Sequence, residues 1–176
     1  MTEYLHLMDL SHLPRFGVKG PAAVAWLQSQ GISVPDRPNS WKPLSDGGLV
    51  ARLGLNEFLL EGSAIAPQLA QACQPPPPRV YPVLRQDRAI CLRGRAVQEL
   101  LRQTCNVNFR ALDLNTHPVI LTTLIGVSVT VIPGEQAGLP FYRIWCDGTF
   151  GTYFWSTLAE ITAELGGRSD RTTQSP

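Results

Sequence analysis

Two short motifs place a basic residue and a glycine directly before a predicted helix. They are KGP at residues 19–21 and RGR at residues 93–95. A helix N-terminus presents unpaired N–H groups and a positive dipole end, so a motif of this kind can receive an anion. The candidates for such a site are Arg15, Lys19, Arg93 and Arg95. The glycine spacing of dinucleotide and phosphate-binding loops is absent, which favours a purely structural turn.

The remaining reactive side chains do not form a catalytic pattern. His6, His12 and His117 are scattered, with no pair at metal-binding spacing. Cys146 is the thiol closest to a predicted turn, but its Asp-flanked setting lacks the positive charge that activates a thiol. No serine lies in a nucleophile-elbow pattern. We therefore predict no catalytic residue and no metal ligand in this chain.

Aromatic side chains are the candidates for contact with a partner protein. Residues 145–155 contain five of them, and core packing explains most. Phe154 lies on the buried face of a predicted helix over residues 153–165, whereas Trp155 is one position off that face. Exposed aromatic rings are common anchors of interfaces. The predicted partner contacts are Trp41, in a long polar loop, together with Trp145 and Trp155.

A repeated strand-turn-helix pattern predicts how these residues are positioned. The stretch RFGVKGPAAVAWLQSQGI at residues 15–32 is echoed by AICLRGRAVQELLRQTCNV at residues 89–107. Each half of the chain then continues with a hairpin and a second helix. This order predicts an α+β fold of two tandem ferredoxin-like, split βαβ plaits, and duplication is favoured over a chance likeness of small domains.

The proline run at residues 75–78 forbids both a helix and a central strand, so it separates the two halves. The expected organisation is listed here in chain order: an N-terminal extension (1–8), a first α+β half (9–74), a proline-rich linker (75–88), a second α+β half (89–167) and a disordered tail (168–176).

Composition narrows the range of partners. The 176 residues include 15 Lys and Arg against 14 Asp and Glu, a net charge of +1, and 44% are hydrophobic. That balance predicts a folded protein without the basic face that nucleic acids or anionic membranes require. The N-terminus lacks a signal-peptide pattern and no apolar run approaches a membrane span, so a cytoplasmic protein is expected. The four cysteines are widely spaced, which favours reduced thiols.

Four blocks of the sequence carry a resemblance to a known family. They are DLSHLPRFGVKGPAAVAWL from Asp9, GGLVARLGLNEFLLEG from Gly47, AICLRGRAVQELL from Ala89 and YRIWCDGTFGTYFWSTLAEI from Tyr142. Over residues 9–167 they resemble the gamma subunit of heterotetrameric sarcosine oxidase. More distantly, they resemble the folate-binding part of the glycine cleavage T protein, whose fold agrees with the predicted tandem plaits.

The resemblance implies a small, non-catalytic subunit beside flavoprotein subunits. Those partners demethylate sarcosine or another N-methyl amino acid and pass the one-carbon unit to tetrahydrofolate. Flavin and NAD are expected only on the partners, and tetrahydrofolate is the cofactor left open for this chain. The T protein's Arg-x-Gly-Tyr-Thr-Gly-Glu type stretch is replaced by YRIWCDGTFG at residues 142–151, and the Lys-Gly-Cys-Tyr type motif of the iron–sulphur maintenance relatives is absent. Independent aminomethyl transfer and iron–sulphur maintenance are therefore not expected.

Two functional hypotheses follow from the sequence. In the first, the chain is an interaction subunit that docks through the loop around Trp41 and the aromatic segment near Trp155. In the alternative, it is a free-standing folate or small-ligand-binding protein of one-carbon metabolism, with a pterin-like ring held between the halves. Arg15, Lys19, Arg93 and Arg95 would then meet a glutamate tail, although a solvated charged face is the more usual role of such residues.

Overall fold

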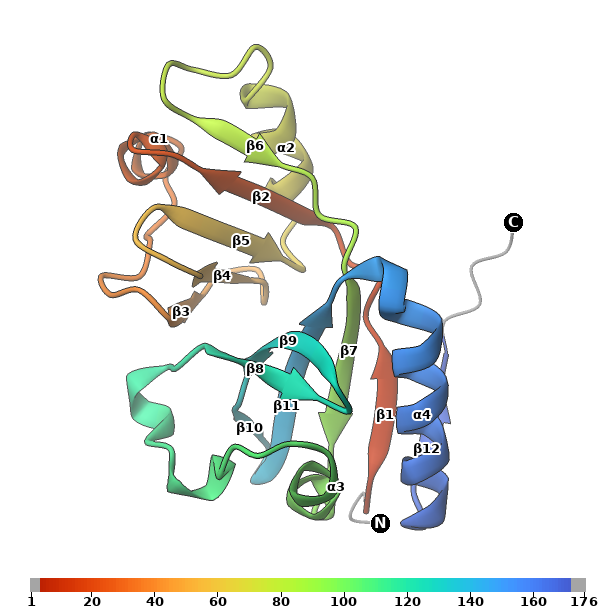
Figure 1. Cartoon of the computed structure of the whole chain (residues 1–176). Coiled ribbons are helices and arrows are strands. Elements are labelled where there is room, and N and C mark those ends of the chain that lie inside the picture. Colours follow the sequence, from red (N-terminus) through yellow and green to blue (C-terminus); the bar gives the residue numbers. More distant parts are fainter. Residues whose placement is uncertain (1–3, 172–176) are drawn as a thin grey trace. The chain divides into compact units, whose positions relative to one another are not determined.

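The computed structural model describes residues 4–171 and shows an α+β protein (Figure 1). Within these residues the chain forms four α-helices and two β-sheets. It divides into two compact units, each described by itself below. Unit 1 comprises residues 4–12, 86–115 and 120–171, and unit 2 comprises residues 13–85 and 116–119. No helix of the described chain is long and apolar enough to cross a membrane.

Unit 2 is built on a five-stranded antiparallel sheet in the order β3-β4-β5-β2-β6. Strand β2, which we call the central strand of this unit because it is paired along both edges and leads into α1, pairs with β5 on one side and β6 on the other. The strands and helices are β2 (Arg15–Lys19), α1 (Ala23–Ser29), β3 (Ser40–Pro43), β4 (Leu49–Arg52), β5 (Glu57–Glu61), α2 (Ile65–Ala72) and β6 (Tyr81–Val83).

The alternation of β2 explains the core of unit 2. Phe16 and Val18 are 5% and 0% exposed, as their spacing predicts, and they share one hydrophobic cluster with Leu27 of α1 and Leu69 of α2. The ring of Phe16 lies 5.8 Å from that of Trp26. Each large side chain buried in this way contributes about 1.5–3 kcal/mol. The helices are therefore held by their apolar faces against β2 and its neighbours.

Unit 1 has a larger sheet in the order β12-β1-β7-β11-β9-β8, with the short strand β10 paired to β11. All pairs are antiparallel except β1 with β12. Its elements are β1 (His6–Asp9), β7 (Arg88–Arg93), α3 (Val97–Thr104), β8 (Ile120–Leu124), β9 (Val127–Ile132), β10 (Glu135–Gln136), β11 (Leu139–Cys146), α4 (Gly151–Glu164) and β12 (Arg168–Asp170). Three short 3-10 helices complete the fold: Phe109–Ala111, Leu114–Thr116 and Gly148–Phe150.

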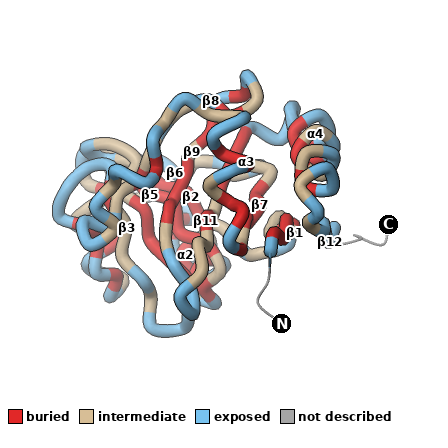
Figure 2. The backbone as a smooth tube through the Cα atoms, turned by 90° about the horizontal axis from the view of Figure 1, so that it is seen from below, coloured by how far each residue is buried: buried red, intermediate tan, exposed pale blue. Residues whose placement is uncertain are grey.

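The core of unit 1 joins the sheet to one face of each helix. Ile90 and Leu92 of β7 cluster with Leu100 of α3 and Phe154 of α4, and all four are fully buried. Figure 2 shows the buried stretches concentrated in the strands and the exposed ones in the connecting loops. The helical spacing read from the sequence at residues 97–104 therefore describes a real buried face.

Both ends of the described chain differ from the organisation expected from the sequence. Part of the expected N-terminal extension forms β1, whose residues from His6 pair with β7 and whose Leu7 is 0% exposed. Residues 168–170 of the expected disordered tail form β12, because β1 offers a free edge for main-chain hydrogen bonds. The rest of that expected tail, residues 172–176, lies outside the described residues.

A segment of the expected second half also contributes to unit 2. Residues 116–119 group with that unit. Ser40 forms a β-bridge with Pro118, and the N–H of Val119 donates to the carbonyl of Asn39 at 2.9 Å. Backbone pairing, rather than order along the chain, places this segment.

Candidate functional site

The two glycine motifs form closely similar turns. Gly20 and Gly94 have φ angles of +125° and +121°, a backbone region that favours glycine. The N–H of Gly20 donates to the carbonyl of Asn56 at 2.9 Å, and that of Gly94 donates to the carbonyl of Pro140 at 3.1 Å. Both glycines therefore end a central strand and tie it to a neighbouring strand region.

The N–H groups that follow these glycines also bond to the protein itself. The N–H of Ala22 donates to the carbonyl of Arg79 at 3.2 Å, and that of Ala96 to the carbonyl of Tyr4 at 2.9 Å. An anion site at a helix start needs such groups to point at the ligand. Here protein carbonyls already accept from them, so the geometry favours the structural interpretation of both motifs.

The four candidate cations belong to different units and have different surroundings. In unit 2, the Nε of Arg15 lies 2.7 Å from Oε2 of Glu61, and the two side chains are 7% and 0% exposed. Lys19 stands opposite Glu57 in the pairing of β2 with β5. In unit 1, Arg93 is half-buried and Arg95 is exposed. The positive charge of Arg15 is thus already neutralised by a buried carboxylate.

The aromatic segment at residues 145–155 requires a correction. Trp145 and Trp155, predicted as partner contacts, are only 2% and 7% exposed. Phe150 and Tyr153 are the exposed rings, at 51% and 53%, and the Oη of Tyr153 donates to the carbonyl of Ile125 at 3.2 Å. Trp155 is buried although it lies at the edge of the apolar face of α4, because neighbouring elements still cover it. No local signal separated these residues, because Tyr153 and Trp155 are each one position from Phe154, and Phe150 precedes α4.

Trp41, the third predicted contact, is half-buried in β3. Its ring centroid lies 4.9 Å from that of His117, with an interplanar angle of 36°. Its main-chain N–H donates to the carbonyl of His117 at 3.0 Å. The indole Nε1 is buried without a hydrogen-bond partner among the described residues. An unsatisfied buried donor is uncommon in folded proteins, so it marks this ring for attention.

The buried thiols are poor nucleophiles. Burial raises the pKa of Cys146 from 9.0 to about 11, against the opposing effect of the Arg88 charge. Burial also raises the pKa of Cys73. A thiol with a raised pKa carries little of the reactive thiolate near neutral pH. Across residues 4–171, no group of three or more His, Cys, Asp or Glu side chains is arranged to hold a metal ion.

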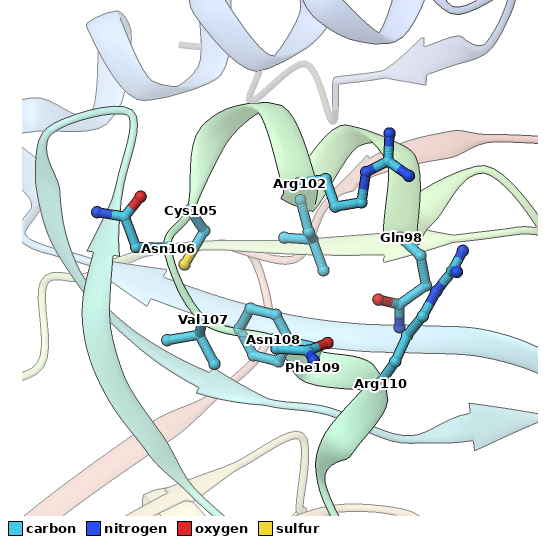
Figure 3. Close-up of a pocket in the computed structure, with 9 residues that line it drawn as sticks. Gln98, Arg102, Cys105, Asn106, Val107, Asn108, Phe109 and Arg110 are labelled. Atoms are coloured by element: carbon cyan, nitrogen blue, oxygen red, sulfur yellow. The ribbon is translucent and has the colours of Figure 1, made fainter.

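A pocket that carries no sequence motif lies in unit 1. It has a volume of about 450 Å³ and is lined by α3 and the segment after it, residues 105–110 (Figure 3). Sequence reasoning missed it because its residues are ordinary in type and only the turn after α3 brings them together. The available signal was a group of two arginines and two asparagines at the end of α3 and in the segment that follows it.

Comparison with known proteins identifies the fold. No protein-family model and no curated protein matches the sequence. Among solved structures, the chain is similar to heterotetrameric sarcosine oxidase from Corynebacterium sp. U-96 in complex with pyrrole 2-carboxylate. The TM-score is 0.72 at 21% identity, covering 98% of this chain and 88% of that chain.

A second similar structure is glycine cleavage system aminomethyltransferase T from Bartonella henselae. Its TM-score is 0.69 at 14% identity, covering 97% of this chain and 48% of that chain, so the present chain spans about half of its length. At these identities the similarity establishes the fold: an α+β fold shared with both proteins. The resemblance found in the four sequence blocks is confirmed at that level.

Proposed function

We propose that this chain is a non-catalytic subunit of a sarcosine-oxidase-type complex in the cytoplasm. Its partner would be a flavoprotein subunit that oxidatively demethylates sarcosine or another N-methyl amino acid, in a reaction linked to tetrahydrofolate. The proposal rests on the extent of the structural match, which covers 98% of this chain and 88% of a sarcosine oxidase chain. The chain thus corresponds to nearly all of one chain of such a protein.

The side-chain chemistry supports the non-catalytic part of the proposal. The two thiols with a shifted pKa, Cys73 and Cys146, are buried and held in the neutral form. Residues 142–151 lack the T protein's conserved type of motif, and in the structure they form the end of β11 and the turn into α4. As the family resemblance implies, flavin and NAD would belong to partner subunits.

We also propose that the two units are duplicated split βαβ plaits. The supporting observation is the sheet order around each central strand: β4-β5-β2-β6 in unit 2 and β9-β11-β7-β1 in unit 1. In both, the central strand is followed by a positive-φ glycine, and a helix begins three residues after that glycine. Two unrelated small domains would have little reason to share these turns as well as the strand order.

A direct role in binding tetrahydrofolate is the alternative, and one part of it does not fit. The four cations assigned to a glutamate tail do not act as a set, because Arg15 is held by the buried carboxylate of Glu61. Lys19 stands opposite Glu57 in the strand pairing, and the Glu57 carboxylate pairs with Arg85. We therefore assign these four residues no role in binding folate. Calorimetric titration of the isolated chain with reduced folates separates the alternatives, since measurable binding would favour a free-standing binder.

The surface proposed for docking combines exposed rings of unit 1. Phe150 and Tyr153 replace Trp145 and Trp155 as contacts, because only the first two are accessible. Trp41 remains a proposed contact in unit 2, since its buried Nε1 lacks a partner. Large exposed aromatic side chains at the centre of an interface commonly contribute most of its binding energy.

Co-expression with the flavoprotein subunits of a heterotetrameric sarcosine oxidase tests the proposal. We expect the tagged chain to co-elute with protein-bound flavin absorbance and with sarcosine-dependent oxygen consumption. Double substitution of Phe150 and Tyr153 with alanine should remove co-elution, whereas Leu55→Ala, at a residue that is 72% exposed in unit 2, should not. A chain that stays monomeric and stable beside these co-expressed flavoprotein subunits would contradict the proposal.

A further inference from the structure

The pocket beside α3 has the size of a small-molecule site. Its volume of about 450 Å³ lies within the roughly 300–1,000 Å³ typical of ligand pockets. All its lining residues come from one continuous stretch, residues 98–110, within unit 1. The pocket is therefore complete within a single unit.

The floor of the pocket is apolar and already held in place. Leu101 and Phe109 are 1% and 3% exposed. The ring of Phe109 packs edge-on against Tyr142 at 5.4 Å, and Nε2 of Gln98 donates to the Tyr142 Oη at 2.6 Å. Burial raises the pKa of the Tyr142 phenol, against the opposing effect of the hydrogen bond from Gln98. A floor fixed in this way costs little to organise when a ligand binds.

The rim, in contrast, carries polar groups without protein partners. Arg102, Asn106, Asn108 and Arg110 are all exposed and line the pocket. In the part of the chain that the structure describes, none of these four side chains makes a hydrogen bond or an ion pair. Figure 3 draws both guanidinium groups on the same side of the pocket as Gln98, with Cys105 and Asn106 on the other.

No acidic side chain compensates these two cations within the lining. Glu99, on α3, lies outside the lining, and Oδ1 of Asp113 accepts hydrogen bonds from Asn115. The carbonyl of Leu101 at the end of α3 accepts the N–H of Cys105 at 2.8 Å.

We propose that this pocket binds a small organic carboxylate. Its apolar body would lie on Leu101 and Phe109, and its carboxylate would pair with the guanidinium groups of Arg102 and Arg110. Arginine binds carboxylates through two parallel, charge-assisted hydrogen bonds, which suits this rim. A simple inorganic anion would leave the apolar floor unused, and a neutral hydrophobe would leave the charges unpaired. This site goes beyond the proposed subunit role and does not depend on it.

Titration of the isolated, ¹⁵N-labelled full chain with phthalate tests the site by NMR. We expect saturable amide shifts confined to residues 98–110, and no comparable shifts with the neutral isostere phthalamide. Arg102→Gln and Arg110→Gln should each weaken binding about tenfold, as expected for loss of a hydrogen bond to a charged group. Arg37→Gln, an exposed arginine in unit 2, is the matched control and should leave the affinity unchanged.

Cys105 provides a second readout that does not depend on the variants. It lines the pocket and is half-buried, so bound phthalate should slow its alkylation while leaving that of urea-unfolded protein unchanged. Three results would overturn the proposal: no shifts at millimolar phthalate, equal shifts with phthalamide, or unchanged affinity in both arginine variants. Displacement of phthalate by a tetraglutamate peptide at much lower concentration would also overturn it, in favour of a protein-docking site.

Discussion

The two units build the same surroundings for their central strands from different parts of the chain. In unit 2, β2 is flanked by β5 and by β6, which follows α2. In unit 1, β7 is flanked by β11 and by β1, which comes from the N-terminal residues. Position in a sheet is thus decided by hydrogen bonding and burial, and the order of strands along the chain can differ.

Although the flanking strands come from different parts of the chain, the main-chain hydrogen bonds at the starts of α1 and α3 are equivalent. Ala22 donates to the carbonyl of Arg79, two residues before β6, and Ala96 donates to that of Tyr4, two residues before β1. The strand segments therefore perform the same task in both units. They bind the edge of the central strand and satisfy an N–H group at the start of the helix.

The charges of the two units are less alike. Unit 2 contains an almost fully buried pair, Arg15 and Glu61, at 7% and 0% side-chain exposure. In unit 1, Arg88 of β7 pairs with Asp9 of β1 at 2.8 Å, at 20% and 4% exposure. Unit 2 should accordingly be more sensitive to the loss of one charge, because water cannot replace the missing partner.

The largest effect should come from Glu61→Ala. Removing this carboxylate leaves the guanidinium of Arg15 buried without its ion-pair partner, which costs about 3–5 kcal/mol of the free energy of unfolding. Glu57→Ala is the control on the same strand, since that side chain is 41% exposed and its pair with Arg85 is worth about 0–1 kcal/mol. Urea unfolding measures both, and equal losses would contradict the distinction.

Substitutions in the flanking strands come next. Leu7→Ala in β1 removes a side chain that is 0% exposed, and loss of such a core leucine costs about 2–5 kcal/mol. Val83→Ala in β6 affects a half-buried side chain, so we expect about 1 kcal/mol. Hydrogen exchange should locate the first effect at β7 and the second at β2. The comparison fails if Leu7→Ala leaves exchange at β7 unchanged.

The two glycine turns should respond alike. Gly20→Ala and Gly94→Ala force a side chain into φ angles above +120°, at a cost of about 1–3 kcal/mol each. At Gly20, the new Cβ would also collide with the carbonyl oxygen of Arg79. Gly54→Ala is the control, because no atom lies within 4 Å of its Cβ position. Thermal unfolding compares the three, and a tolerated Gly94→Ala would show that the turns are not equivalent.

The smallest effect that we expect is a change in the free energy of unfolding at alkaline pH. Because the folded state raises the pKa of Cys146 from 9.0 to about 11, its thiol favours folding fully below pH 9. That stability is lost as the pH rises from about 9 to about 11, since the unfolded chain loses the proton first. Cys146→Ala should flatten this part of the stability profile measured by urea unfolding. A profile unchanged by the substitution would show that the thiol does not cause it.

Local elements were the part of the fold that sequence patterns predicted well. The alternation in residues 15–19 identified β2, and the apolar spacing in residues 97–104 identified α3. The hairpin of β4 and β5 was also expected from its turn residues. These signals are local because side-chain direction repeats every two residues in a strand and about every 3.6 in a helix.

The candidate site was predicted less well, because it depends on neighbours that are distant in sequence. Glu61 neutralises Arg15 from 46 positions away, so the type of residue 15 alone could not reveal its role. Trp145 and Trp155 looked available as anchors, yet both are buried. The exposed rings, Phe150 and Tyr153, lie in the same segment. The sequence therefore identified a segment with exposed aromatic side chains, but the residues predicted within it were the buried ones.

By itself, the sequence determined the strand-turn-helix units, the glycines at their turns and the resemblance that the fold comparison supports. Only the tertiary structure decided that β1 and β12 complete the sheet of unit 1, that Arg15 is neutralised, and that a cationic pocket opens beside α3. The physical reason is that a backbone dihedral or an apolar stripe is set by residues a few positions apart. Burial, ion pairing and pockets depend instead on which distant segments the folded chain brings into contact.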